Sequence, residues 1–204
     1  MQHHHPQNHH PHKTTAFVLG NGKSRLSLNL DALRLHGAVY GCNALYRDFT
    51  PDYLVAVDAK MVIELNENRV QDKTSVWTNK NRKIENFTNI NFFVPHRGWS
   101  SGPSALWLAA QHNYHQIYFL GFDYTGIMGK HNNVYSDTLN YRKSTDNATY
   151  SGNWERQTAQ VLKEFPGIKF TRVIPQGSYI PQSLITTLEN FSHMNLDEFD
   201  KTFK

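Results

Sequence analysis

The sequence is poor in cysteine, in charged residues and in long apolar runs. Its single cysteine, Cys42, cannot form a disulfide within the chain, and its place in an apolar run favours a buried thiol over a nucleophile. No apolar run reaches the roughly 18 residues that a spanning helix needs, so we expect no membrane span. The first residues carry histidines where a secretory signal would need an apolar stretch. We therefore expect a cytoplasmic protein.

Charge is also scarce, at 19% of the residues, and the formal net charge is +4 with a pI near 9.1. The positive residues are scattered, and the densest group, Lys80, Arg82 and Lys83, is explained equally well as a solvated loop. We therefore expect no nucleic-acid partner, and the positive balance favours a small ligand that carries phosphate. The 204 residues are enough for one domain around a single core.

The first 13 residues hold six of the twelve histidines, interleaved with Pro, Gln and Asn. Such a composition cannot bury apolar surface, so we expect residues 1–13 to be a disordered arm or a tag. No cysteine or carboxylate accompanies these histidines. We therefore predict no specific metal site there.

From Thr15 onward, short apolar runs alternate with helical stretches. This alternation predicts one α/β, Rossmann-like domain over residues 14–181, with a mostly parallel sheet flanked by helices. Residues 124–150 lack periodicity and are typical of a long loop that serves as a lid. Residues 182–204 are expected to form a C-terminal helix and a frayed tail. The expected strands are 16–19, 38–42, 53–57, 75–78, 91–94, 116–120 and 169–174, and the expected helices are 61–65, 104–114, 154–165 and 184–191.

A glycine-rich loop, Gly20-Asn21-Gly22-Lys23-Ser24, directly follows the first expected strand. It is neither a Walker loop, which needs a glycine where this chain has Phe17, nor the dinucleotide fingerprint, which needs one at Arg25. The loop is either a plain turn or a place where phosphate approaches main-chain amides, and its position at a strand's carboxyl end favours the phosphate site. In the second case, Gly22→Val should abolish nucleotide binding and leave a folded protein.

Several short motifs follow one another in a recognisable order. They are Gly20-Asn21-Gly22-Lys23-Ser24, Tyr40-Gly41-Cys42-Asn43, residues 51–58, Ser100-Ser101-Gly102, residues 117–123 and residues 150–154. Their order resembles the bacterial sialyltransferases of glycosyltransferase family 42 and the related archaeal hydroxymethylpterin diphosphokinase-like proteins, over most of residues 15–175. The resemblance implies a Rossmann-like nucleotide-dependent transferase. Its donor would be a sugar nucleotide such as a CMP-sugar, and its acceptor a small molecule or a glycan.

The resemblance also assigns residues to the nucleotide. Asn21 and Gly22 would contact its phosphates or ribose, and Asn43 would lie beside them at the end of the second strand. Ser101 and Gly102 would add a second set of amides at a helix N-terminus. The structural alternatives are that Asn43 only ends a strand and that Ser101 only caps a helix.

Five further polar residues complete the candidate nucleotide site. Lys23 stands where the family commonly has proline, so it could reach a phosphate directly, next to Ser24. Asp58 and Asp123 both end strands, where each could bind ribose hydroxyls or a metal, or only bind a loop. Arg97 could hold a phosphate or a carboxylate in a bidentate manner, or simply lie at the surface.

The catalytic histidine that the family places just before the position of Tyr150 is missing, because Ala148 and Thr149 precede it. Sugar transfer would therefore need other groups. The chain has no Asp-x-Asp pair, so this reaction would require no cofactor. Three lid residues are the candidates: Tyr124 and Tyr135 would assist the leaving phosphate, and His131 would act as the base.

Two other functions stay open. One is diphosphate transfer from ATP, in which Mg²⁺ would act together with Asp58, Asp123 and Lys23. The other is a nucleotide-binding protein without catalysis, which the missing histidine favours. His96 is the alternative to His131 as a base, and an exposed loop histidine without chemistry is the alternative for both.

Overall fold

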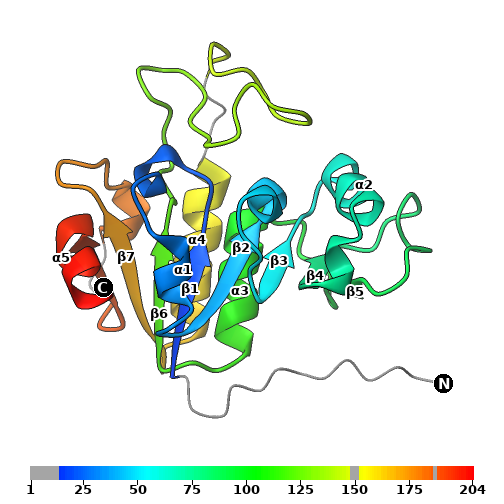
Figure 1. Cartoon of the computed structure of the whole chain (residues 1–204). Coiled ribbons are helices and arrows are strands. Elements are labelled where there is room, and N and C mark those ends of the chain that lie inside the picture. Colours follow the sequence, from blue (N-terminus) through cyan, green and yellow to red (C-terminus); the bar gives the residue numbers. More distant parts are fainter. Residues whose placement is uncertain (1–13, 148–151, 186–187) are drawn as a thin grey trace.

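The chain folds around one sheet of eight parallel strands (Figure 1). The computed structural model describes residues 14–147, 152–185 and 188–204. Neighbouring strands are all paired in parallel, in the order β5-β4-β3-β2-β1-β6-β7-β8. This confirms the predicted α/β, Rossmann-like fold. The strands are β1 (Thr15–Leu19), β2 (Ala38–Cys42), β3 (Tyr53–Val55), β4 (Ser75–Thr78), β5 (Asn91–Phe92), β6 (Gln116–Leu120), β7 (Lys169–Ile174) and β8 (Phe191–Asn195).

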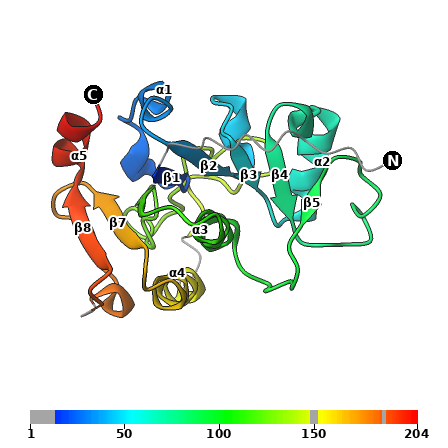
Figure 2. The same cartoon turned by 90° about the horizontal axis from the view of Figure 1, so that it is seen from below.

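Helices cover both faces of the sheet (Figure 2). Side chains of a strand point alternately to its two faces, so Val18 of β1 packs toward α3 and α4 while Phe17 packs toward α2 and α5. The helices are α1 (Leu30–Leu33), α2 (Ala59–Glu67), α3 (Ser101–Gln111), α4 (Gly152–Glu164) and α5 (Leu196–Thr202), and short 3-10 turns form η1 (Lys23–Arg25), η2 (Asn43–Arg47), η3 (Val70–Asp72) and η4 (Gln182–Leu184). In the described part of the chain, no helix combines the length and the apolar character needed to cross a bilayer.

Cys42 lies at the end of β2 and is buried. Burial raises the pKa of its thiol to about 12. The prediction of a buried thiol is therefore confirmed. The N-terminal residues 1–13, expected to be an arm or a tag, lie outside the described residues.

The C-terminal part of the chain differs from the prediction. The helix expected over 184–191 is wrong in its described part, because η4 ends at Leu184 and β8 begins at Phe191 and pairs with β7. Phe191 and Met194 pack into opposite core clusters, which is the alternation of a strand. The tail after β8 is also no frayed end. The rings of Phe199 in α5 and of Phe203 just after it lie at centroid distances of 5.1–5.9 Å from those of Phe17 and Tyr118 in the sheet.

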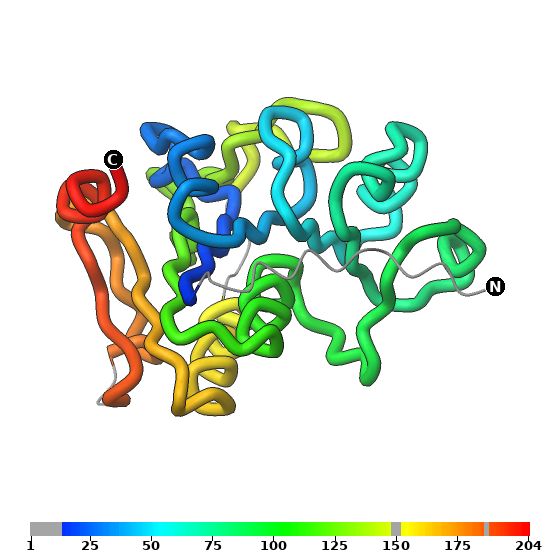
Figure 3. The backbone as a smooth tube through the Cα atoms, turned by 60° about the horizontal axis from the view of Figure 1, so that its bottom comes forward, coloured from blue at the N-terminus to red at the C-terminus, as the bar shows by residue number. Residues whose placement is uncertain are grey.

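The strand order determines where a ligand can bind. From β1 the chain adds strands on one side up to β5, then crosses over and continues on the other side with β6. All carboxyl ends therefore lie along one edge, the upper edge in Figure 1, where ligands of such sheets collect. Residues 124–147, the described part of the expected lid, extend over this edge. Figure 3 shows residues 79–99 at the opposite end of the sheet from β8 and α5.

Candidate functional site

The crossover between β1 and β6 is closed by direct backbone contact. Gly20 N donates to Leu120 O at 2.8 Å, and Gly22 N donates to Gly121 O at 2.9 Å. A Cβ atom on Gly20 would lie 2.6 Å from Gly121 O, so only glycine fits. A ligand therefore has no room between the two loops, and it can only lie farther out along the edge.

The other amides of the glycine-rich loop also donate within the protein. Lys23 N donates to Asn132 Oδ1 at 2.8 Å, and Ser24 N donates to Asp123 Oδ2 at 3.1 Å. Ser24 Oγ hydrogen-bonds the second oxygen of the Asp123 carboxylate. Gly22, Lys23 and Ser24 therefore do not present the phosphate-binding amides that the sequence predicted, because these three amides already have acceptors. Asp123 takes the structural alternative and binds the loop.

Arg25 is a buried residue that sequence reasoning missed. It follows the loop, is 5% exposed, and donates from Nε to Gly20 O at 2.8 Å and from an Nη to Asn21 Oδ1 at 3.0 Å. A third contact, 3.5 Å long, reaches the hydroxyl of Tyr135. Arg25 thus fixes the loop from below. In the sequence, Arg25 serves only to exclude the dinucleotide fingerprint, which needs a glycine at this position.

The structure brings three of the predicted nucleotide contacts to neighbouring strand ends. Asn21 follows β1, and its Nδ2 donates to Cys42 O at 3.0 Å, at the end of β2. Asn43 follows β2, and its Oδ1 accepts from Ser101 Oγ at 3.2 Å. Ser101 Oγ also accepts from Val57 N at 3.1 Å, beyond the end of β3. These three side chains, the Asn21–Asn43–Ser101 group, span the carboxyl ends of β1 to β3.

Asn43 has a φ of 53°, in the left-handed region that asparagine tolerates better than most residues. The backbone thus turns sharply where β2 ends, and η2 begins there. Tyr141 covers this turn, since its hydroxyl accepts from Ala44 N at 3.2 Å. Burial raises the pKa of Tyr141 to about 12, so its hydroxyl stays protonated. Tyr141 was not predicted.

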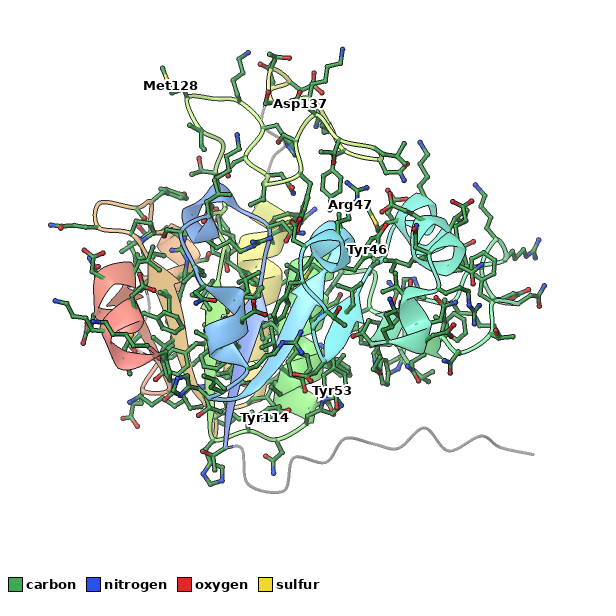
Figure 4. All side chains as sticks on the ribbon, in the orientation of Figure 1. Tyr46, Arg47, Tyr53, Tyr114, Met128 and Asp137 are labelled. Atoms are coloured by element: carbon green, nitrogen blue, oxygen red, sulfur yellow. The ribbon has the colours of Figure 1, made fainter. Side chains whose placement is uncertain are left out.

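The expected lid is anchored to the body of the protein through η2. Arg47 forms an ion pair of 2.6 Å with Glu64 of α2 and also donates to Thr138 Oγ1 at 2.8 Å and to Leu139 O at 2.9 Å. Asn140 Nδ2 reaches the same carboxylate at 3.1 Å. Figure 4 shows Arg47 directly below the segment that carries Asp137. The lid therefore lies docked over the carboxyl edge.

Two of the three predicted catalytic residues lie inside this docked structure. Tyr124 is 3% exposed and donates to Thr158 Oγ1 at 2.9 Å, while Tyr135 is 5% exposed and donates to Asp48 Oδ2 at 2.7 Å. Burial raises the pKa of both hydroxyls. Both tyrosines thus have structural partners, and neither presents an exposed acid to the edge.

His131 differs from the tyrosines. Its Nε2 is buried and has no hydrogen-bond partner among the described residues. Burial, and then the positive charges of Arg142 and Lys23, lower its pKa below the ordinary 6.5. The imidazole is therefore neutral near pH 7 and able to accept a proton. Its closeness to Lys23 places it beside the glycine-rich loop.

Of three further predicted contacts, Asp58 and Arg97 have other partners, and Gly102 lies next to Ser101. Asp58 caps α2, accepting from Lys60 N at 2.8 Å. Arg97 forms a 2.8 Å ion pair with Glu164, and so has a partner other than a ligand phosphate. Gly102 follows Ser101 in α3, and a Cβ there would lie 3.3 Å from the ring of Phe122. The positions before Tyr150, where the family histidine would stand, lie outside the described residues.

No family model matches the chain. No curated protein and no solved structure matches it either. The resemblance to the sialyltransferases therefore stays a prediction that rests on the motifs alone. Among the described residues, no three His, Cys, Asp or Glu side chains are grouped so that they could hold a metal ion.

Proposed function

We propose that this protein is a nucleotide-dependent transferase that holds its donor over the carboxyl ends of β1, β2 and β3. The donor is a sugar nucleotide such as a CMP-sugar, and the acceptor is a small molecule or a glycan. The observation that carries this proposal is that Asn43 and Ser101 meet from separate elements on one edge, beside Asn21, whose amide is already held by Cys42 O and Arg25. Such side chains suit ribose and phosphate oxygens because amides and hydroxyls donate and accept without adding charge.

The lid supports a transfer step on the same edge. An acceptor hydroxyl would attack the anomeric carbon, the bond to the nucleotide phosphate would break, and the hydroxyl proton would pass to His131. An imidazole that stays neutral near pH 7 is in the protonation state that a base needs. Lys23, close enough to influence that pKa, would offset the negative charge of the leaving phosphate.

Binding without catalysis is the second candidate, and one observation favours it. Tyr124 and Tyr135, expected to assist the leaving phosphate, are buried and hydrogen-bonded within the protein. Diphosphate transfer from ATP is less well supported, because Asp58 and Asp123, expected to act with Mg²⁺, bind a helix end and the glycine-rich loop.

A thermal-shift panel of CMP, CDP, UDP, ATP and GTP, with and without Mg²⁺, tests the proposal. A nucleotide at about 100 times its dissociation constant should stabilise the native protein by about 2.7 kcal/mol. We expect stabilisation by CMP without Mg²⁺. Consumption of the matching sugar nucleotide with a broad set of acceptors then distinguishes the transferase from the binding protein.

The variant Asn43→Gly locates the site. Glycine tolerates the left-handed backbone at this position, so the variant removes the side chain without adding strain. The matched control is Asn113→Gly, which has a similar φ of 62° and lies before β6, at the opposite edge of the sheet. We expect Asn43→Gly to weaken nucleotide binding at least about tenfold, as for loss of one or two hydrogen bonds, and Asn113→Gly to leave it unchanged. Equal affinities in both variants would place the nucleotide elsewhere.

A further inference from the structure

A polar hollow of about 240 Å³ lies at the same edge of the sheet, beyond β3 and β4. Its lining residues come from three segments of the chain, which directly follow the carboxyl ends of β3, β4 and β5. Residues 79–99 lie at this end of the sheet, whereas β8 and α5 lie at the opposite end (Figure 3). The volume suits a ligand of about one sugar ring, somewhat below that of pockets for drug-sized molecules. The lining includes Val57, Asn79, Lys80 and Trp99.

The charge of the lining favours an anion. Lys80 contributes a positive charge, and no Asp or Glu lines the hollow. None of the ion pairs among the described residues involves Lys80. Its ammonium is thus available to a ligand, as a point charge for a carboxylate or a phosphate.

The aromatic wall is held in place by a stack of side chains. The guanidinium of Arg97 lies 4.7 Å from the ring centre of Trp99 and 4.9 Å from that of Trp107. The 2.8 Å ion pair with Glu164 of α4 fixes this guanidinium. Arg97, expected from the sequence to bind a ligand, thus acts as a positioning residue for Trp99. A fixed indole ring is a suitable surface for the apolar face of a sugar.

The hollow borders the Asn21–Asn43–Ser101 group at Val57. Val57 is one of the residues that line the hollow, and its backbone N–H donates to Ser101 Oγ. A ligand in the hollow would therefore lie next to a nucleotide bound over β1 to β3.

We propose that the hollow is the acceptor pocket and that it binds a hydroxyl-bearing ring with one negatively charged group. This inference rests on the proposed function for the role of acceptor, whereas the binding itself does not require a nucleotide. The negative group contacts Lys80, the ring lies against Trp99, and Asn79 hydrogen-bonds ring hydroxyls. The charge can come from a carboxylate or from a phosphate.

Indole N–H signals in a proton–nitrogen NMR spectrum test the inference, since the chain has only four tryptophans. The signal of Trp99 is the one lost in Trp99→Phe. The probes are glucuronate, glucose 6-phosphate and neutral glucose, each added to the full chain without nucleotide. We expect the Trp99 signal to shift with at least one of the charged sugars and not with glucose. A shift with only one of the two identifies the charged group.

The variant Lys80→Gln should weaken binding of the charged sugar about tenfold, the usual effect of losing one hydrogen bond to a charged group. Lys83→Gln is the matched control, because it removes the same charge from the same loop but does not line the hollow. A silent Trp99 signal, an equal response to glucose, or equal losses in the two variants would each overturn the inference. If nucleotides bind and the sugars do not, only this inference fails. If the sugars bind and no nucleotide does, the proposed function fails and the pocket remains.

Discussion

Gly22 gives the sharpest test of how the edge of the sheet is built. Its φ of −64° and ψ of 146° are open to any residue, so its backbone does not require glycine. The neighbouring atoms do require glycine, because a Cβ atom there would overlap the Asp123 carboxylate and lie 2.7 Å from Gly121 O. Gly22→Ala should therefore destabilise the fold through steric overlap alone.

The expected cost follows from the two contacts. Overpacking at a close backbone contact costs about 1–3 kcal/mol. Displacement of Asp123 also weakens its hydrogen bonds to Ser24, each worth about 1 kcal/mol. We expect Gly22→Ala to lower the free energy of unfolding by about 2–4 kcal/mol and Tm by about 5–15 °C. The larger Gly22→Val should not leave a stable fold, which corrects the expectation from the sequence.

Urea denaturation of Gly22→Ala measures this change. The control is Gly167→Ala, where a new Cβ has nothing within 4 Å and no positive φ is involved. Adding Asp123→Ala should relieve part of the overlap, so the double variant should lose less stability than the two single variants together. If Gly22→Ala unfolds within about 0.5 kcal/mol of the wild type, which is the range of a harmless surface substitution, the closed crossover is wrong.

Two remaining predictions concern ionisable groups, Glu64 at the anchor of the lid and His131 within the lid. Burial alone would raise the pKa of Glu64, but hydrogen bonds from Arg47, Tyr46 and Asn140 outweigh it and lower the pKa. The stability that Glu64 contributes is therefore complete above the unfolded pKa of about 4.3, and it is lost as pH falls through the lower folded pKa. In urea titrations between about pH 3 and 6, the free energy of unfolding should decline less steeply for Glu64→Gln than for the wild type. His131→Ala should lower the rate of sugar-nucleotide turnover by about 10²- to 10⁴-fold, and the acid limb of wild-type kcat/KM should lie below pH 6.5, the ordinary histidine pKa. Full activity in His131→Ala would point to another base.

The sheet was largely predictable because its central strands are buried apolar runs. β2, β4, β6 and β7 have the predicted bounds, and α4 follows the apolar spacing from Trp154 to Phe165. β8 was missed because its sequence, Phe-Ser-His-Met-Asn, has little apolar contrast. Its pairing with β7 depends on a partner strand that local periodicity does not reveal.

Only part of the candidate site could be predicted from the sequence, for the same reason. Asn21 and Asn43 could be placed together because parallel strands bring their carboxyl ends to one edge. Asn132 and Tyr141 could not, since their contacts with Lys23 and Ala44 span 109 and 97 residues of sequence. A segment without periodicity carries no signal for where it docks. The same holds for the hydrogen bonds of Arg47 to Thr138 and Leu139, which anchor that segment.

A glycine after a first strand can make room for a ligand or for another backbone segment. Substitutions at the glycine have different effects in the two cases. At Gly22 the approaching group is Gly121 O, so a variant there should lose ligand binding only to the extent that it unfolds. At Asn43 the side-chain amide faces Ser101 at the strand ends, so Asn43→Gly should lose binding while keeping its stability. If the loss of ligand affinity and the loss of unfolding free energy are measured separately for each variant, the two variants therefore distinguish a residue that contacts the ligand from one that only stabilises the fold at the same edge of the sheet.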